Sequence, residues 1–234
     1  MATVDLSSPI PILAVPGVMI IPHASLSINV IDGRSRRMAD DVLAGCGDDE
    51  TLRGGSIAVA SLPMGRATAA GHPSMRQAVC VTKVVRRQRR VGGGDSLLLA
   101  GACRARILAL VQPDDDVPYQ RAVLEAIPDA GDPVAQPAVR DLCELLANSR
   151  LNRLHDGRVA LRMLRDGQVP SEAAIDIAGM MLVREDEDRY RLLSLASPRD
   201  RARVVWNALC GMDRLIRRAD EQHPESWPKG MSWN

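Results

Sequence analysis

The sequence predicts an α+β protein, with a β-rich part over residues 1–128, a helical part over 129–221 and a tail over 222–234. In the first part, short apolar runs that often alternate with polar residues are separated by Gly, Pro and Asp, which is typical of strands joined by turns. The segment Pro128–Pro137 is rich in Pro, Gly and Asp and has no periodicity, so it marks a boundary. After it, apolar residues recur every three or four positions, as in helices.

The first part is expected to hold about seven strands. Their ranges are Ile10–Val15, Val18–Ile21, Leu26–Ile31, Ile57–Leu62, Ala78–Arg86, Ser96–Leu110 and Tyr119–Ile127. A short helix is expected over Arg34–Leu43, after a turn at Asp32-Gly33, and Gly92–Asp95 predicts a hairpin because Gly adopts positive φ easily. One helix among many short strands favours a small barrel or folded sheet.

The second part is expected to form a bundle of helices. Their ranges are about 139–146, Leu151–Leu164 with an interruption near Asp156-Gly157, Ser171–Val183 with Ser171 as N-cap, Asp186–Leu195, and a last helix after the N-cap Ser197. The last helix is the clearest, because Pro198 stands at its first position and one stripe is apolar through Ile216. Five basic residues are expected to surround that stripe: Arg201, Arg203, Arg214, Arg217 and Arg218.

Composition excludes several classes of protein. The 30 Lys and Arg nearly balance the 29 Asp and Glu, so the chain as a whole does not attract nucleic acid or an anionic membrane. Five cysteines without a CxxC pair argue against a disulfide framework and a zinc site, and favour reduced thiols in the cytoplasm. Pro11 and Pro16 break the first apolar stretch, so neither a signal peptide nor a membrane span is expected there.

Several motifs occur in an order that resembles the N-terminal (LON) domain of Lon proteases, especially its stand-alone bacterial versions. They are Val15–Gly17, Ile21–His23 in place of a Phe-Pro-Gly turn, Ile31–Arg36, Val79–Val85, the Gly92–Asp95 turn, Leu97–Leu99, the Gly-x-x-Arg-x-Arg-Ile strand Gly101–Ile107, Pro118–Ala122 and the capped helix Ser197–Ile216. The resemblance covers about residues 8–220. It implies a PUA-like β-barrel followed by an α-helical subdomain.

The resemblance also implies a function, because in full-length Lon proteases this region recognises unfolded or tagged proteins in protein quality control. The ATPase ring and Ser–Lys peptidase that normally follow it are not expected here. A P-loop needs GxxxxGK[ST], and neither Lys83 nor Lys229 stands in that context. We therefore expect no catalytic residue and no cofactor.

Two acidic or metal-ligating patterns have ordinary structural explanations. The four histidines His23, His72, His155 and His223 are scattered without metal-ligand spacing. The run Asp114–Asp116 lacks alternating ligands and a turn Gly, so it is expected to be a solvated loop. No metal site is predicted.

The leading hypothesis is binding of unfolded or extended protein segments, and a protease or chaperone would be a compatible partner. The preferred site lies at the junction of barrel and bundle, with Ile20, Ile21 and His23 on the barrel side and Met180 and Met181 on the helical side. Met is chosen because its side chain adapts to varied partners. The tail, with Trp227 and Trp233, could dock in the same groove or link two copies of the chain.

The alternative hypothesis is RNA binding through the basic cluster Lys83, Arg86, Arg87, Arg89 and Arg90. No stacking aromatic residue lies nearby in the sequence, which makes nucleic acid the less favoured partner. A continuous basic stripe would favour RNA, whereas an apolar patch would favour peptide.

Overall fold

The computed structural model describes residues 4–44, 55–62, 75–90, 94–129 and 135–222. The chain forms two compact units. The first comprises Met1–Gly131 together with Arg184–Ser197, and the second comprises Asp132–Val183 together with Pro198–Asn234. The units are therefore not consecutive in sequence, because the segment Arg184–Ser197 belongs with the sheet.

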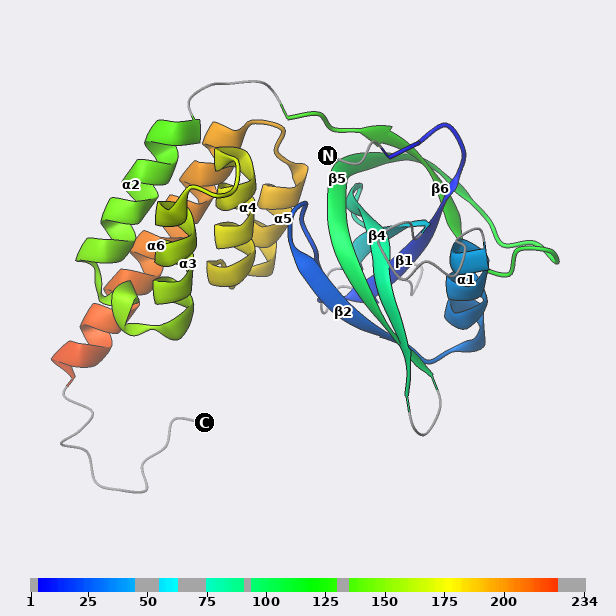
Figure 1. Cartoon of the computed structure of the whole chain (residues 1–234), viewed down its shortest axis with the longest axis horizontal. Coiled ribbons are helices and arrows are strands. Elements are labelled where there is room, and N and C mark those ends of the chain that lie inside the picture. The colour runs from blue at the N-terminus through cyan, green and yellow to red at the C-terminus, as the bar shows by residue number, and fades with distance from the viewer. Residues whose placement is uncertain (1–3, 45–54, 63–74, 91–93, 130–134, 223–234) are drawn as a thin grey trace, which may run out of the picture. The chain divides into compact units, whose positions relative to one another are not determined.

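The first unit is built on a six-stranded sheet (Figure 1). Its strands are β1 (Ile10–Pro16), β2 (Ser25–Val30), β3 (Ser56–Leu62), β4 (Ala78–Arg89), β5 (Asp95–Val111) and β6 (Arg121–Ala126). The order is β2-β5-β4-β3-β1-β6, and β5 also pairs with β6, so the sheet curls back on itself. The ladder between β1 and β6 has only two residue pairs, Ile10↔Ala122 and Pro11↔Arg121. The predicted α+β class is confirmed, but the sheet is a curled one with a short last ladder and not a regular closed barrel.

The core of the curled sheet is made of small and branched aliphatic side chains, as a chain without Phe requires. Its buried members are Ile10, Ile12, Ala58, Ala60, Val79, Val81, Ala105, Ala122 and Leu124. Alanines on β3 and β6 leave the room that the larger residues on β1 and β4 fill.

Two helices belong to the first unit. Helix α1 (Gly33–Ala44) begins where the sequence predicts, because the Asp32 carboxylate accepts a hydrogen bond of 2.9 Å from the Ser35 backbone N–H. Hydrogen bonding with the Ser35 side chain, and then with its backbone N–H, lowers the pKa of Asp32. Helix α5 (Asp186–Ser194) packs on β4, where the Tyr190 hydroxyl accepts a hydrogen bond from the backbone N–H of Ala78.

One expected strand is absent from the described residues. The run Val18–Ile21 is an irregular segment, although Ile20 and Ile21 are each only 1% exposed. The backbone beyond it turns, because the His23 N–H donates to the Gly101 carbonyl and the Ala24 N–H donates back to the Ile21 carbonyl. An apolar run is buried in either conformation, so its composition alone could not distinguish strand from coil.

The second unit is helical, as predicted. It contains α2 (Ala135–Asn148), the 3₁₀ turn η1 (Arg150–Arg153), α3 (His155–Asp166), α4 (Ser171–Leu182) and α6 (Pro198–Glu221). The helix expected over Leu151–Leu164 is divided between η1 and α3. The expected N-cap of α4 was wrong by one residue, because Pro170 holds the cap position and no side chain caps the helix.

Arg201, one of the basic residues expected around the apolar stripe of the last helix, lies in the core of the second unit. Its side chain is fully buried, and its Nε lies 2.9 Å from the Oδ1 of Asp176 on α4, which is also fully buried. A charge removed from water needs such an opposite charge, so the pair joins α4 to α6 inside the second unit.

Gly101 on β5 allows two backbone segments to approach closely. A Cβ built there would lie 2.9 Å from the carbonyl carbon of Ile21 and 3.0 Å from the Cα of Pro22. The segments are also joined by hydrogen bonds, from the His23 N–H to the Gly101 carbonyl at 2.9 Å and from the Gly101 N–H to the Ala24 carbonyl at 2.8 Å. The position tolerates no side chain without moving backbone.

We predict that Gly101→Ala destabilises the protein by about 2–3 kcal/mol, because the new methyl group meets backbone and not a side chain that could rotate. Gly211→Ala on α6 is the matched control, since nothing lies within 4 Å of its built Cβ. The control should gain about 0.5–1 kcal/mol from helix propensity. Urea unfolding of the two variants measures the difference, and equal midpoints would contradict the packing argument.

Candidate functional site

Strand β2 has an open edge. It pairs with β5 alone, whereas each of the other five strands in the described part of the chain pairs with at least two neighbours. Its six residues, Ser-Leu-Ser-Ile-Asn-Val, include no charge and no Pro, and its ladder with β5 runs without a bulge. Natural proteins usually protect an open edge with charged residues, Pro or a bulge. Strand β2 has none of these, so its edge is available to another strand.

The register shows which backbone groups of β2 face outward. The Gly101 N–H donates to the Ala24 carbonyl, and the ladder continues regularly from Ser25↔Ala100 to Val30↔Asp95. Because the backbone groups of successive residues point to opposite edges, those of Ser25, Ser27 and Asn29 point away from β5. The side chains of these three residues are exposed, whereas Ile28 and Val30 are buried.

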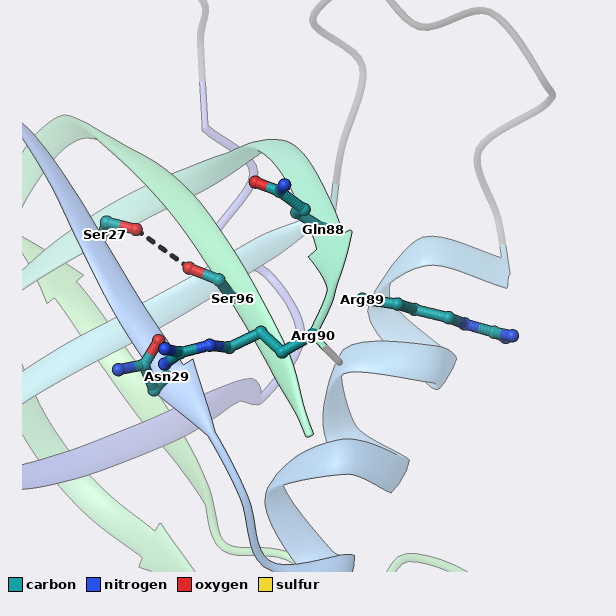
Figure 2. A pocket seen from close by; sticks show the side chains of 6 residues that line it. All are labelled: Ser27, Asn29, Gln88, Arg89, Arg90 and Ser96. Atoms are coloured by element: carbon teal, nitrogen blue, oxygen red, sulfur yellow. Dashed lines mark hydrogen bonds between the residues drawn. The ribbon is translucent and has the colours of Figure 1, made fainter. Parts of the chain in front are cut away.

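The exposed face of the β2–β5–β4 ribbon is polar and basic. Cross-strand pairing places three rows on it: Ser25–Ala100–Lys83, Ser27–Leu98–Arg86 and Asn29–Ser96–Gln88. The Ser27 and Ser96 hydroxyl oxygens are 3.0 Å apart, which joins two of the strands through their side chains (Figure 2). We call these three rows, with Arg90 beyond them, the outer face. It contains no carboxylate.

A shallow hollow of about 680 Å³ lies on the outer face and around the end of the hairpin. Its lining residues are Ser27, Asn29, Gln88, Arg89, Arg90 and Ser96 (Figure 2). All six side chains offer hydrogen-bond donors. The hollow therefore suits a polar or anionic group and not an apolar one.

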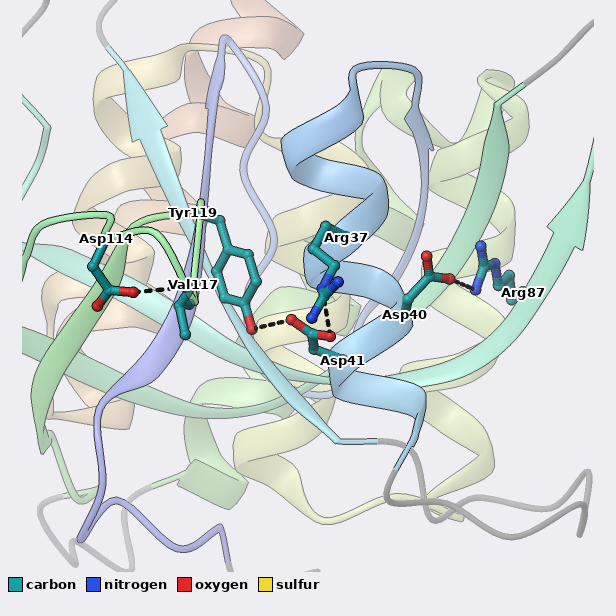
Figure 3. Close-up of polar contacts among 7 residues, drawn as sticks. All are labelled: Arg37, Asp40, Asp41, Arg87, Asp114, Val117 and Tyr119. Atoms are coloured by element: carbon teal, nitrogen blue, oxygen red, sulfur yellow. Dashed lines mark hydrogen bonds and ion pairs between the residues drawn. The ribbon is translucent and has the colours of Figure 1, made fainter.

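The basic cluster of the hairpin is divided between two faces of β4. A register shift between Val84 and Arg86 sets Arg86 opposite Leu98 on the outer face, and Arg87 opposite Leu97 on the other. The Arg87 guanidinium makes an ion pair of 2.5 Å with Asp40 of α1 (Figure 3). It makes a second ion pair, also of 2.5 Å, with Asp95. Arg87 thereby lowers the pKa of Asp95. Arg89 points toward the side of α1, whereas Arg90 lies beside Asn29 of β2 (Figure 2).

Polar contacts also hold α1 in place on the side away from the outer face. The Tyr119 hydroxyl donates to Asp41 at 3.0 Å, and Arg37 donates to the other oxygen of the same carboxylate at 2.9 Å (Figure 3). Burial, with the hydrogen bond to Asp41, raises the pKa of Tyr119.

The acidic run Asp114–Asp116 forms a locally hydrogen-bonded loop, because the Asp114 carboxylate accepts a 2.7 Å hydrogen bond from the Val117 N–H.

The family model for the substrate-binding domain of ATP-dependent protease La (LON) matches residues 9–210 of the chain. The chain belongs to this family. The resemblance found in the sequence is thereby confirmed over most of the chain. No curated protein matches it.

Two solved LON domains have similar folds. The N-terminal domain of the Mycobacterium avium complex Lon protease is 18% identical, with a TM-score of 0.63 over 87% of this chain and 98% of that one. The Lon N-terminal domain protein from Xanthomonas campestris is 16% identical, with a TM-score of 0.55 over 86% of this chain and 98% of that one. At these identities the likeness shows the fold.

The peptide-contact residues predicted from the sequence lie in both units. Ile20 and Ile21 are core residues of the turn before β2, and His23, in the same turn, is half-buried. Met180 and Met181 are half-buried neighbours at the end of α4 in the second unit. Their role in binding stays a prediction, and for the isoleucines it would require the turn to move. The tail with Trp227 and Trp233 lies outside the described residues.

Sequence reasoning missed two features of this LON domain. The edge of β2 depends on strand order, for which the sequence carries no signal. Trp206 on α6 is 37% exposed and lines a hollow of about 250 Å³ between α2 and α6. It adjoins the predicted apolar stripe of this helix but does not belong to it.

Other chemistry is not supported by the described residues. Among them no three His, Cys, Asp or Glu side chains gather as a metal-ligand set, and no helix there is long and apolar enough to cross a membrane. Burial raises the pKa of Cys103 and of Cys143, which disfavours their nucleophilic thiolate form.

His23 has a backbone conformation that favours glycine. Its φ is 67°, and it stands where the LON turn motif has the Gly of Phe-Pro-Gly. We predict that His23→Gly is more stable than His23→Ala by about 1 kcal/mol, because both remove the imidazole but only Gly relieves the left-handed backbone. Comparison of urea unfolding midpoints checks this. Equal stability of the two variants would show that the turn is not strained.

Proposed function

We propose that this LON domain is a non-catalytic binding module that holds unfolded or extended segments of protein substrates, and that the segment adds as a strand to β2. The observation that carries the proposal is the open edge of β2. Three residues present outward backbone donors and acceptors, and these are the groups that an extended chain satisfies when it joins a sheet. Recognition through backbone groups is largely independent of sequence, which suits a domain that handles many substrates.

The end of β2 supports the same proposal. Ile31, which directly follows the strand, is 71% exposed. An apolar side chain of an added strand could cover it, because diagonal neighbours on adjacent strands come within reach of each other. The edge then offers backbone pairing along its length and one apolar contact at its end.

RNA binding is less well supported. Arg87 is engaged by two carboxylates, and Arg89 points away from Arg90, so the predicted basic cluster does not form one continuous stripe. The described aromatic residues Tyr119, Tyr190 and Trp206 belong to other parts of the chain, so none stands in the three rows of the outer face. Bases would lack a stacking surface there.

Ser27→Pro tests the proposal. Pro at position 27 removes the central one of the three outward N–H groups of β2 and should block strand addition. It breaks no hydrogen bond to β5, because the backbone groups of residue 27 point away from that strand. We expect the variant to bind a reduced and carboxamidomethylated model protein at least about tenfold more weakly than the parent, measured by fluorescence anisotropy. Its unfolding midpoint should be close to that of the parent.

Ser27→Ala is the matched control, because it removes the hydroxyl and keeps the N–H. It should bind like the parent. Equal loss in both variants would assign binding to the side chain, and unchanged binding in Ser27→Pro would exclude strand addition at this edge.

We also predict that the purified chain neither hydrolyses ATP nor cleaves casein. Lys83 lies opposite Ser56 in the β3–β4 ladder. It is therefore the lysine to mutate in a test for a Ser–Lys dyad, which needs the two side chains to be neighbours. Turnover above background that disappears in Lys83→Ala would therefore contradict the non-catalytic assignment. Release of labelled phosphate and of labelled casein fragments are the two measurements.

A further inference from the structure

The two faces of the hairpin β4–β5 differ in charge balance. On the side of α1, Arg87 is neutralised by Asp40 and Asp95. On the outer face, Lys83, Arg86 and Arg90 stand without a carboxylate in any of the three rows. Neither Arg86 nor Arg90 forms an ion pair with a residue that the structure describes. The outer face therefore carries a net positive charge that the fold does not use.

Protection of a sheet edge accounts for only part of this arrangement of charge. Charged residues commonly guard edge strands against pairing with other chains. Strand β3 pairs with β4 only over Cys80–Lys83, so the stretch of β4 that holds Arg86 pairs with β5 alone, and Arg86 can guard that part of the edge. Strand β2, which has an open edge along its whole length, carries no charge at all.

One of these cations is already placed next to the open edge. The Arg90 side chain points toward Asn29 (Figure 2), and both residues line the same hollow. A strand added to β2 would lie about 4.8 Å from it, with alternate side chains on the outer face. A carboxylate opposite Asn29 or Ser27 would then meet Arg90, together with the hydroxyl and amide donors of the hollow.

We infer that the edge of β2 prefers substrate segments that carry Asp or Glu at alternate positions, with a carboxylate on the outer face near Arg90. Arg86, which β5 and β2 separate from the added strand, contributes a weaker attraction over a longer distance. The inference rests on the proposed strand addition and adds a substrate class to it. Backbone pairing supplies general affinity, and the unneutralised cations select among sequences. Carboxylate is the favoured anion because the face offers isolated cations and hydrogen-bond donors without the aromatic surface that nucleobases need.

The test uses three extended peptides that alternate Val with Glu, with Gln or with Lys, and the full chain. We expect the Glu peptide to bind about two- to fivefold more tightly than the Gln peptide, from one surface ion pair with Arg90 and the weaker attraction of Arg86, and the Lys peptide to bind most weakly. The preference should vanish in the double variant Arg86→Gln/Arg90→Gln, which should bind the Gln peptide as the parent does. Raising salt from about 0.05 M to about 0.5 M should also remove it.

Arg106→Gln is the control variant, because Arg106 is likewise an exposed strand arginine, paired in register with Ala78 and Glu125 away from β2. It should keep the preference for Glu. If the Glu and Gln peptides bind equally and both lose affinity in Ser27→Pro, strand addition stands and the acidic preference is overturned. If no peptide binds, the proposed function itself fails. If single-stranded RNA binds through Arg86 and Arg90 and the Glu peptide does not, the face is a nucleic-acid site and the inference is wrong.

Discussion

The close approach of the backbone at Gly101 to the turn Ile21–Ala24 is the contact on which the rest of the first unit depends. Two hydrogen bonds fix the turn against β5, and the absence of a side chain at Gly101 lets the strands come together. The position of this turn sets where β2 begins, and with it the register of the whole β2–β5 ladder. A shift of one residue would bury Ser27 and Asn29 and expose Ile28 and Val30. The open edge and the composition of the outer face both follow from this one contact.

Charge is distributed so that the two sides of the hairpin have different roles. Helix α1 brings Asp40 to Arg87 and Asp41 to Tyr119, which ties the helix to β4 and to the segment before β6. These carboxylates neutralise the cation on their own side and leave those on the outer face unmatched. A structural network and a recognition surface thus share one short basic sequence, and the register shift after Val84 is what separates them.

Particular residues show how far sequence reasoning reached. The strands around Gly101–Ile107 and the helix after Asp32 were predicted correctly, because periodicity and capping are local properties. The run Val18–Ile21 was wrongly predicted as a strand, since burial of apolar side chains does not require pairing. The burial of Arg201 was not predicted, because its buried partner Asp176 stands 25 positions earlier in the sequence. In the candidate site, the sequence singled out the basic residues of the hairpin, whereas the open edge of β2 was missed.

The sequence by itself determined the family, the order of the elements and the aliphatic character of the core, because motif spacing, periodicity and composition are properties of the chain as written. Only the tertiary structure decided which strand of the sheet lacks a second neighbour, which arginines are neutralised and which are left at the surface. Those outcomes depend on pairing between segments far apart in the chain, such as Ser27 with Leu98 and Arg87 with Asp40. No local pattern encodes such a pairing, because its free energy comes from contacts that exist only once both segments are in place.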